Sequence, residues 1–156
     1  SDVLLKETAM YKHILIATDG SEIAEKAVAH GVALAKALGA KVSLITVTGV
    51  PPGLSHPQIA VHLPEIMRQV AKAAEIHLAT AQAIAQRLGL TAETVHVENE
   101  HIYEGVIETA RSCGADLIVM GSHGRGAFKS MLLGSVTLKV LTHSTVPVLV
   151  HRASQS

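Results

Sequence analysis

The stretch at residues 120–140, MGSHGRGAFKSMLLGSVTLKV, decides how the fold of this chain can be interpreted. It begins at the last residue of the apolar run LIVM, passes Gly121 and Gly124, and reaches Gly134 and Ser135 before a helical pattern begins. Connections in compact domains are mostly short, and long ordered loops are usually functional. The stretch therefore predicts a strand, a glycine-rich loop that does more than turn the chain, and a helix.

The residue types in this loop suit an anionic ligand. Glycine allows a ligand to approach the backbone closely, and the N–H groups at a helix start favour phosphate oxygens. Ser135 adds a hydroxyl donor, and Arg125 and Lys129 add positive charge. A Walker A loop is excluded because Lys129-Ser130 follows Phe128 rather than glycine, and GRGAFK does not complete G-x-G-x-x-G. The spacing G-x2-G-x9-G-S predicts another kind of phosphate-binding loop.

The rest of the chain repeats the alternation of strand and helix. Continuous apolar, β-branched runs predict strands buried on both faces, and apolar residues spaced by threes and fours predict helices. The predicted strands are residues 12–18, 42–47, 94–97, 117–120 and 146–150. The predicted helices are residues 21–39, 64–88, 102–114 and 135–143. Together they predict an α/β fold with one five-stranded parallel sheet, helices on both faces and right-handed crossovers.

The strand order can also be predicted. Residues 94–97 are short and polar, and the last strand contains Pro147, which cannot donate to a ladder and belongs at an edge. The order 3-2-1-4-5 places both strands at edges and the first and fourth side by side. Ligands bind at the carboxyl ends of such a pair, where the chain direction across the sheet reverses. This predicts a site between the turn ATDG, residues 17–20, and the glycine loop.

A family resemblance supports the same interpretation. Gly121, Gly124, Gly134 and Ser135 match the nucleotide-binding motif of the universal stress protein family, and HILIATDGS and VPVLV also look like that family. The resemblance covers residues 11–152 and implies an adenine nucleotide α-hydrolase-like, Rossmann-like fold. It further implies a cytoplasmic stress-response protein that binds ATP, with ADP, AMP and the Mg²⁺ complex left open. A homodimer joined through residues 146–150 is also implied.

The resemblance assigns roles position by position. Asp19 corresponds to an acidic residue near the adenosine, and Ala17 and Val47 correspond to positions where the backbone meets the adenine. Ala17 departs from relatives that carry proline, which matters little where only the backbone is used. No residue is predicted to be catalytic or to bind metal without the nucleotide. The predicted nucleotide-binding residues are Ala17, Thr18, Asp19, Val47, Met120, Gly121, Ser122, His123, Gly124, Arg125, Gly126, Ala127, Gly134, Ser135, Val136 and Thr137.

Simpler structural interpretations stand beside these roles. The glycine loop could be only a long turn, and Asp19 could only brace the first turn. His77 is interpreted as a hydrogen-bonded packing residue, and Cys113 as part of a helix core. Ten histidines without zinc-site spacing favour scattered side chains over a metal site. The predicted apolar face of the helix at residues 64–88 is Ile66, Val70, Ala73, His77, Ala81, Ile84 and Leu88.

Composition excludes several classes of protein. Thirteen basic residues balance thirteen acidic ones, so nothing indicates binding to nucleic acid or an anionic membrane. No apolar run approaches the roughly 18 residues of a membrane-spanning helix, and residues 1–9 lack the features of a signal peptide. The single Cys113 suits a reducing compartment, so we expect the cytoplasm. We interpret residues 1–10 as an extension or tag remnant, 11–152 as one domain and 153–156 as a tail.

Three functions remain open from the sequence. The favoured one is an ATP-binding regulatory protein of the stress response. A slow ATPase or nucleotidyl transferase would need a group that positions the attacking water or acceptor, and the loop offers no convincing base. The third is a dimeric interaction module that ignores nucleotides. We expect the first, with at most weak ATP hydrolysis.

Overall fold

The computed structural model describes residues 10–50, 53–54, 56–124 and 132–152 of the chain. In this part of the chain, five parallel strands form one sheet in the order β3-β2-β1-β4-β5. The α/β class and the strand order predicted from the sequence are confirmed. The elements are β1 (His13–Ala17), α2 (Glu22–Leu38), β2 (Lys41–Thr48), α3 (Pro57–Ala60), α4 (Leu63–Arg87), β3 (Glu93–Glu98), α5 (Ile102–Cys113), β4 (Leu117–Gly121), α6 (Ser135–His143) and β5 (Val148–His151).

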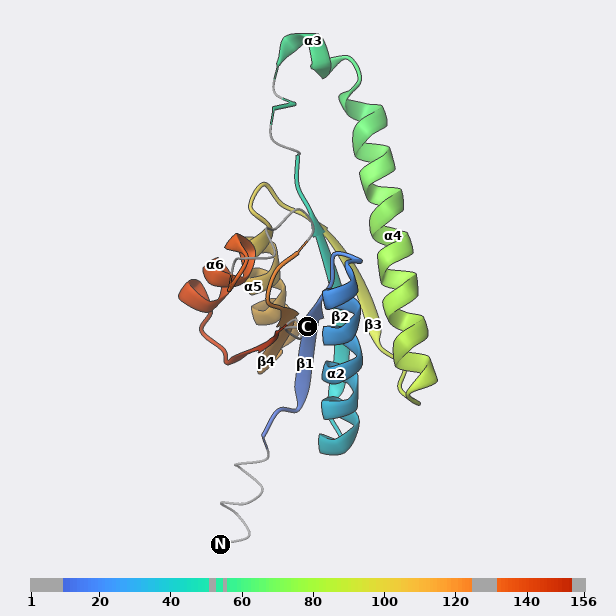
Figure 1. The fold of residues 1–156 in the computed structure, drawn as a ribbon, viewed down its shortest axis with the longest axis vertical. Coiled ribbons are helices and arrows are strands. Elements are labelled where there is room, and N and C mark those ends of the chain that lie inside the picture. The colour runs from blue at the N-terminus through green and yellow to red at the C-terminus, as the bar shows by residue number, and fades with distance from the viewer. Residues whose placement is uncertain (1–9, 51–52, 55, 125–131, 153–156) are drawn as a thin grey trace, which may run out of the picture.

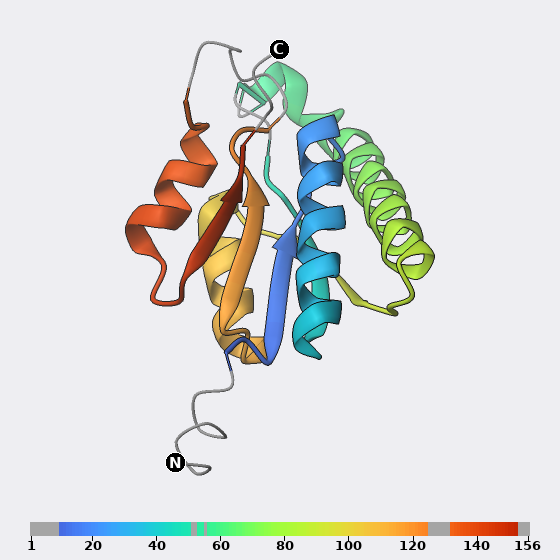
Figure 2. The same cartoon turned by 60° about the horizontal axis from the view of Figure 1, so that its bottom comes forward.

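Helices cover both faces of the sheet (Figures 1 and 2). α2 and α4 pack on one face, and α5 and α6 lie on the other. In the central strand β1, Ile14 and Ile16 enter the core beneath α2 and α4, whereas Leu15 enters the core beneath α5 and α6. All three side chains are fully buried. The uninterrupted apolar run of this strand follows from its being covered on both sides.

α2 begins and ends as the sequence predicts and lies close to the sheet. The Ser21 side chain accepts a hydrogen bond from the Ala24 N–H (3.3 Å), and Gly39 follows the last helical residue. At the middle of the helix, a Cβ built on Gly31 would lie 2.6 Å from Cδ1 of Ile16. Glycine at this position therefore lets the helix backbone approach β1 more closely than a larger residue would.

α4 packs with a face that matches the predicted one only in part. Its buried residues are Ala74, Leu78, Ala81 and Ala85. Of the predicted stripe only Ala81 is buried, and the other members, including His77, are half-buried. The prediction holds in part, since Ile84 and Leu88 also pack against the core. The fully buried contact is shifted by one residue along most of the stripe, and its mostly small side chains allow α4 to lie close to the sheet and to α2.

The first half of α4 and the short helix α3 project beyond the rest of the fold (Figure 1). None of residues 63–73 is buried. α3 was not predicted, because a single turn offers no periodic pattern, although Pro57 occupies a position in its first turn that suits proline. Despite the 25 residues of α4, no helix in the described part of the chain combines the length and apolar character needed to cross a membrane.

The edge strand β5 begins later than predicted. The sequence predicted residues 146–150, whereas the strand runs from Val148 to His151. Pro147 precedes it and still contributes its carbonyl oxygen, which accepts a hydrogen bond from the Ile118 N–H (3.0 Å). The ladder starts after Pro147 because proline has no N–H to donate. The inference that proline places this strand at the edge is confirmed by the observed order.

At the amino end of β1, Asp116 fixes the incoming chain. Its carboxylate accepts hydrogen bonds from the N–H groups of Lys12 (2.8 Å) and His13 (3.0 Å). The His13 ring donates from Nδ1 to the Cys113 carbonyl (3.0 Å) and pairs through Nε2 with Ser43 Oγ (2.8 Å). Burial raises the pKa of Asp116, but the backbone hydrogen bonds outweigh it and leave that pKa below its ordinary 3.8.

Replacing Asp116 by alanine is expected to lower the free energy of unfolding near neutral pH by about 1 to 2 kcal/mol, because two N–H groups lose a charged acceptor. Because the pKa is lowered in the folded protein, the Asp116 carboxylate stabilises the fold fully at pH values above about 4. This contribution is lost as the pH falls through the lowered pKa. Urea unfolding at pH 7 and at pH 3 measures this, with Glu108→Ala on the exposed side of α5 as control. An equal loss of unfolding free energy in Asp116→Ala at pH 7 and at pH 3 would contradict a stabilising role of the charged carboxylate.

Candidate functional site

A cavity of about 520 Å³ lies at the carboxyl ends of β1 and β4. The ends of three strands, the starts of α5 and α6, and the turns after β1 and β4 form its walls. This is the place predicted from the strand order. The residues that line it are Ala17, Thr18, Asp19, Ala24, Ile45, Val47, Ile102, Val106, Met120, Gly121, His123, Gly124, Gly134, Ser135, Val136 and Thr137.

The structure brings most of the predicted site residues together along this cavity. Ser122 is the exception among the described ones: it is buried, and its backbone serves the loop rather than the cavity wall. Arg125, Gly126 and Ala127, as well as Lys129, lie outside the described residues. The positions of the other predicted residues agree with a common site, and their roles toward a ligand remain predictions.

Four lining residues were missed by the sequence interpretation: Ala24, Ile45, Ile102 and Val106. The signal for Ile45 was present, because it lies two residues before Val47 in the same strand and so shares a face with it. Ile102 begins α5 and is 40% exposed, and it lies on the cavity wall with Val106 one helical turn later. These residues give one part of the cavity an apolar surface.

The turn after β1 presents Asp19 to the cavity. Its Oδ1 accepts a hydrogen bond from the Ser21 N–H (3.0 Å), so the carboxylate braces its own turn, as the structural interpretation held. The Gly20 N–H bonds to Thr18 Oγ1 (3.2 Å), and Gly20 has a φ of 78°, a conformation that glycine adopts readily. A Cβ on Gly124 would overlap Oδ2 of Asp19. The two turns therefore face each other closely.

The two ends of the glycine loop are tied side by side. The Gly134 N–H donates to the Ser122 carbonyl (2.6 Å), and the Ser122 N–H donates to the His151 carbonyl (2.8 Å). A Cβ on Gly134 would lie 3.0 Å from Cα of His123, which leaves little room for a side chain. The Thr137 hydroxyl, on the first turn of α6, donates to the Gly121 carbonyl (2.9 Å). These bonds fix the helix start against the end of β4.

The start of α6 has the character of an anion site. The first N–H groups of a helix have no partner within the helix, and in the described residues no side chain caps them at Gly134. Ser135, Val136 and Thr137 line the cavity at this point. The positive end of the helix dipole favours a negative group there. Apolar walls at one end and a helix start at the other suit a ligand with a flat apolar part and an anionic tail.

Nothing in the described residues suggests a protein-bound metal. No group of three or more histidine, cysteine, aspartate or glutamate side chains among them is placed to hold a metal ion. Several histidines in this part of the chain bond to hydroxyls or carbonyls, as His96 does to Thr48 Oγ1 (2.7 Å).

Replacing Thr137 by valine is expected to lower the free energy of unfolding by about 1 to 2 kcal/mol, because the buried Gly121 carbonyl loses a hydrogen-bond donor. Thr142→Val is a matched control: its hydroxyl donates to the Leu138 carbonyl (2.7 Å) on the exposed side of the same helix. Chemical denaturation of both variants measures the difference. Equal effects would mean that the tie to β4 adds no stability.

Comparison with known proteins gives consistent matches over nearly the whole chain. The model of the universal stress protein family matches residues 10–152. Universal stress protein YxiE of Bacillus subtilis (strain 168) is 35% identical over 154 residues, which cover 92% of this chain and 100% of that protein. The structure of MJ0577 of Methanocaldococcus jannaschii superimposes with a TM-score of 0.79 at 31% identity, covering 94% of this chain and 99% of the other. A universal stress protein in complex with cAMP gives a TM-score of 0.66 at 27% identity, covering 92% and 98%.

Proposed function

This chain belongs to the universal stress protein family, and we propose that it is a regulatory stress-response protein that binds an adenine nucleotide, ATP above all, between β1 and β4. One observation carries the proposal: the cavity is lined by an apolar wall, by Asp19 and by the start of α6, which no described side chain caps. That a relative forms a complex with cAMP supports an adenine nucleotide as the class of ligand.

The proposed pose follows from the two ends of the cavity. The base lies against the apolar wall that includes Val47, Ile102 and Val106, where it leaves water. Asp19, at the rim between the ends, accepts hydrogen bonds from ribose hydroxyls. The phosphates lie at the start of α6, where Ser135 donates from its backbone and hydroxyl. Arg125, Gly126 and Ala127 belong to the same proposed cradle by their place in the motif.

We propose binding rather than rapid turnover. Among the described lining residues Asp19 is the single carboxylate, and it already accepts a bond from Ser21. Fast phosphoryl transfer needs a group that positions the attacking water beside the terminal phosphate. Asp19 lies at the nucleoside end in the proposed pose. Signalling would then depend on the difference between the nucleotide-bound and the nucleotide-free protein. We propose the cytoplasm as its compartment, where the thiol of Cys113 stays reduced.

Calorimetric titration with ATP, ADP, AMP and cAMP is expected to show binding, with GTP as a comparison for the base. ATP at about 100 times its dissociation constant should add about 2.7 kcal/mol to the free energy of unfolding. Gly124→Val should weaken ATP binding and reduce the added stability, because its side chain would displace the Asp19 carboxylate and narrow the cavity beside the loop. Ala33→Val, on the exposed side of α2, is the control for added bulk.

The absence of heat and of any thermal shift with every adenine nucleotide would refute the proposal. A dissociation constant for Gly124→Val equal to that of the wild type would move the site elsewhere. Phosphate release measured on the same two proteins tests turnover, since equal release from both would come from a contaminating enzyme.

We also propose a homodimer formed through β5. This edge strand pairs with β4 on one side only. Its Leu149 side chain is 39% exposed, because α2 covers that face of β5 only in part. The carbonyls of Pro147 and His151 bond toward β4, so the backbone groups of Val148 and Val150 point outward. Two such strands can pair across a twofold axis.

Val150→Pro is expected to convert the dimer to a monomer, because it removes an outward N–H without removing a bond to β4. Val150→Thr keeps that N–H and serves as the control. Sedimentation equilibrium of the three proteins measures the mass. A monomeric wild type, or a proline variant that stays dimeric, would count against this interface.

A further inference from the structure

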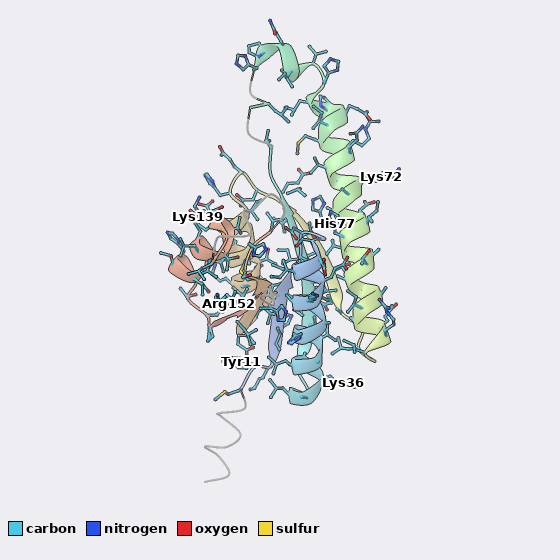
Figure 3. All side chains as sticks on the ribbon, in the orientation of Figure 1. Tyr11, Lys36, Lys72, His77, Lys139 and Arg152 are labelled. Carbon is cyan, nitrogen blue, oxygen red and sulfur yellow. The ribbon has the colours of Figure 1, made fainter. Side chains whose placement is uncertain are left out.

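We infer that His77 is a positioning residue of the nucleotide site, acting from α4 on the turn that carries Asp19. The inference rests on the proposed function, since it concerns the same site. The sequence interpretation gave His77 only a packing role within an apolar stripe. The structure places it instead between α4 and the upper end of α2, next to the turn after β1 (Figure 3).

The contact between the His77 ring and Gly20 is the first step of the argument. A Cβ built on Gly20 would overlap Nδ1 and Cε1 of the imidazole and would lie 2.6 Å from its Cγ. Three ring atoms at this range mean that the ring covers the side of Gly20 where a side chain would stand. Two features therefore favour glycine over a larger residue at position 20: its backbone φ of 78° and the His77 ring beside it.

The second step connects this contact to the cavity. The sheet side of the turn is held by the bonds from Gly20 N–H to Thr18 Oγ1 and from Thr46 Oγ1 to the Thr18 carbonyl (2.9 Å). The side facing α4 is closed by the His77 ring. Asp19 lies between these two supports and faces Gly124. Removal of the ring would open space beside Gly20 and let the carboxylate leave its position.

The third step is that α4 holds His77 firmly. Ala74, Leu78 and Ala81 flank it in the helix and are at least 93% buried, so the backbone at this point is anchored in the core. His77 itself does not line the cavity. It therefore acts on the nucleotide through Gly20 and Asp19 and not by contact. Positioning from a packed helix gives a binding group less freedom than support from a loop.

The experiment compares nucleotide affinity with stability. His77→Ala is expected to weaken ATP binding about tenfold, an effect within the usual range for neighbouring residues that act on one site together. His77→Phe, which keeps a flat ring, should bind close to the wild type. Ile76→Ala, at the neighbouring and 57% exposed position of α4, is the matched control and should bind as the wild type does. Unfolding of the nucleotide-free variants is measured alongside. Should His77→Ala fail to fold, His77→Gln takes its place.

A double-mutant cycle separates positioning from general weakening of the fold. In an Asp19→Asn background, His77→Ala should change the dissociation constant little, because the group through which it acts has already lost its charge. Independent, additive losses would overturn the inference, and so would unaltered ATP affinity in His77→Ala or equal weakening in His77→Phe. A wild type that binds no adenine nucleotide would instead refute the proposed function.

Discussion

The parallel pairing of β1 with β4 is the constraint on which the site depends. The two strands lie side by side from Ile14 opposite Leu117 to Ile16 opposite Val119, and then their chains separate. The chain leaving β1 enters α2 on one face of the sheet, and the chain leaving β4 returns through α6 on the other. Since the two connections diverge, a gap remains above the strand ends. The position of the cavity therefore follows from the order of the strands, and the residues that line it determine which class of ligand it suits.

Much of this arrangement could be predicted from the sequence because it follows from local rules. A strand covered on both faces must be apolar throughout, so HILIA and LIVM could hardly be surface segments. Ser21 and Gly39 mark the ends of a helix by hydrogen bonding and backbone conformation. Once the order of strands was inferred, the two turns beside the reversal point became neighbours. The glycines at residues 121, 124 and 134 then indicated how closely the backbone would approach a ligand.

What could not be predicted depends on where elements end in space. The face of α4 was predicted from residues spaced by threes and fours, but Ile66 and Val70 lie in the half of the helix that extends past the sheet. The pattern of a helix shows its period and not the length of its contact. Val106 belongs to the core cluster and also lines the adjoining cavity, a double place that its helical spacing does not indicate. The approach of His77 to Gly20 joins residues far apart in the chain, and no local pattern indicates it.

The glycine at the middle of α2 has a consequence for how mutations in this fold would be interpreted. A Cβ built on Gly31, near the middle of the helix, would lie 2.6 Å from Cδ1 of Ile16 and 3.3 Å from Cγ1 of Val119. A bulkier residue would push the middle of α2 away from the sheet and tilt the helix. Because the turn with Asp19 directly precedes the first residues of α2, that turn would shift as well. A genetic screen for loss of the proposed nucleotide binding would therefore recover Gly31 together with the lining residues, although Gly31 does not line the cavity. Loss of binding would then have two causes, a changed lining residue or a displaced helix, and only a structure of the variant would distinguish them.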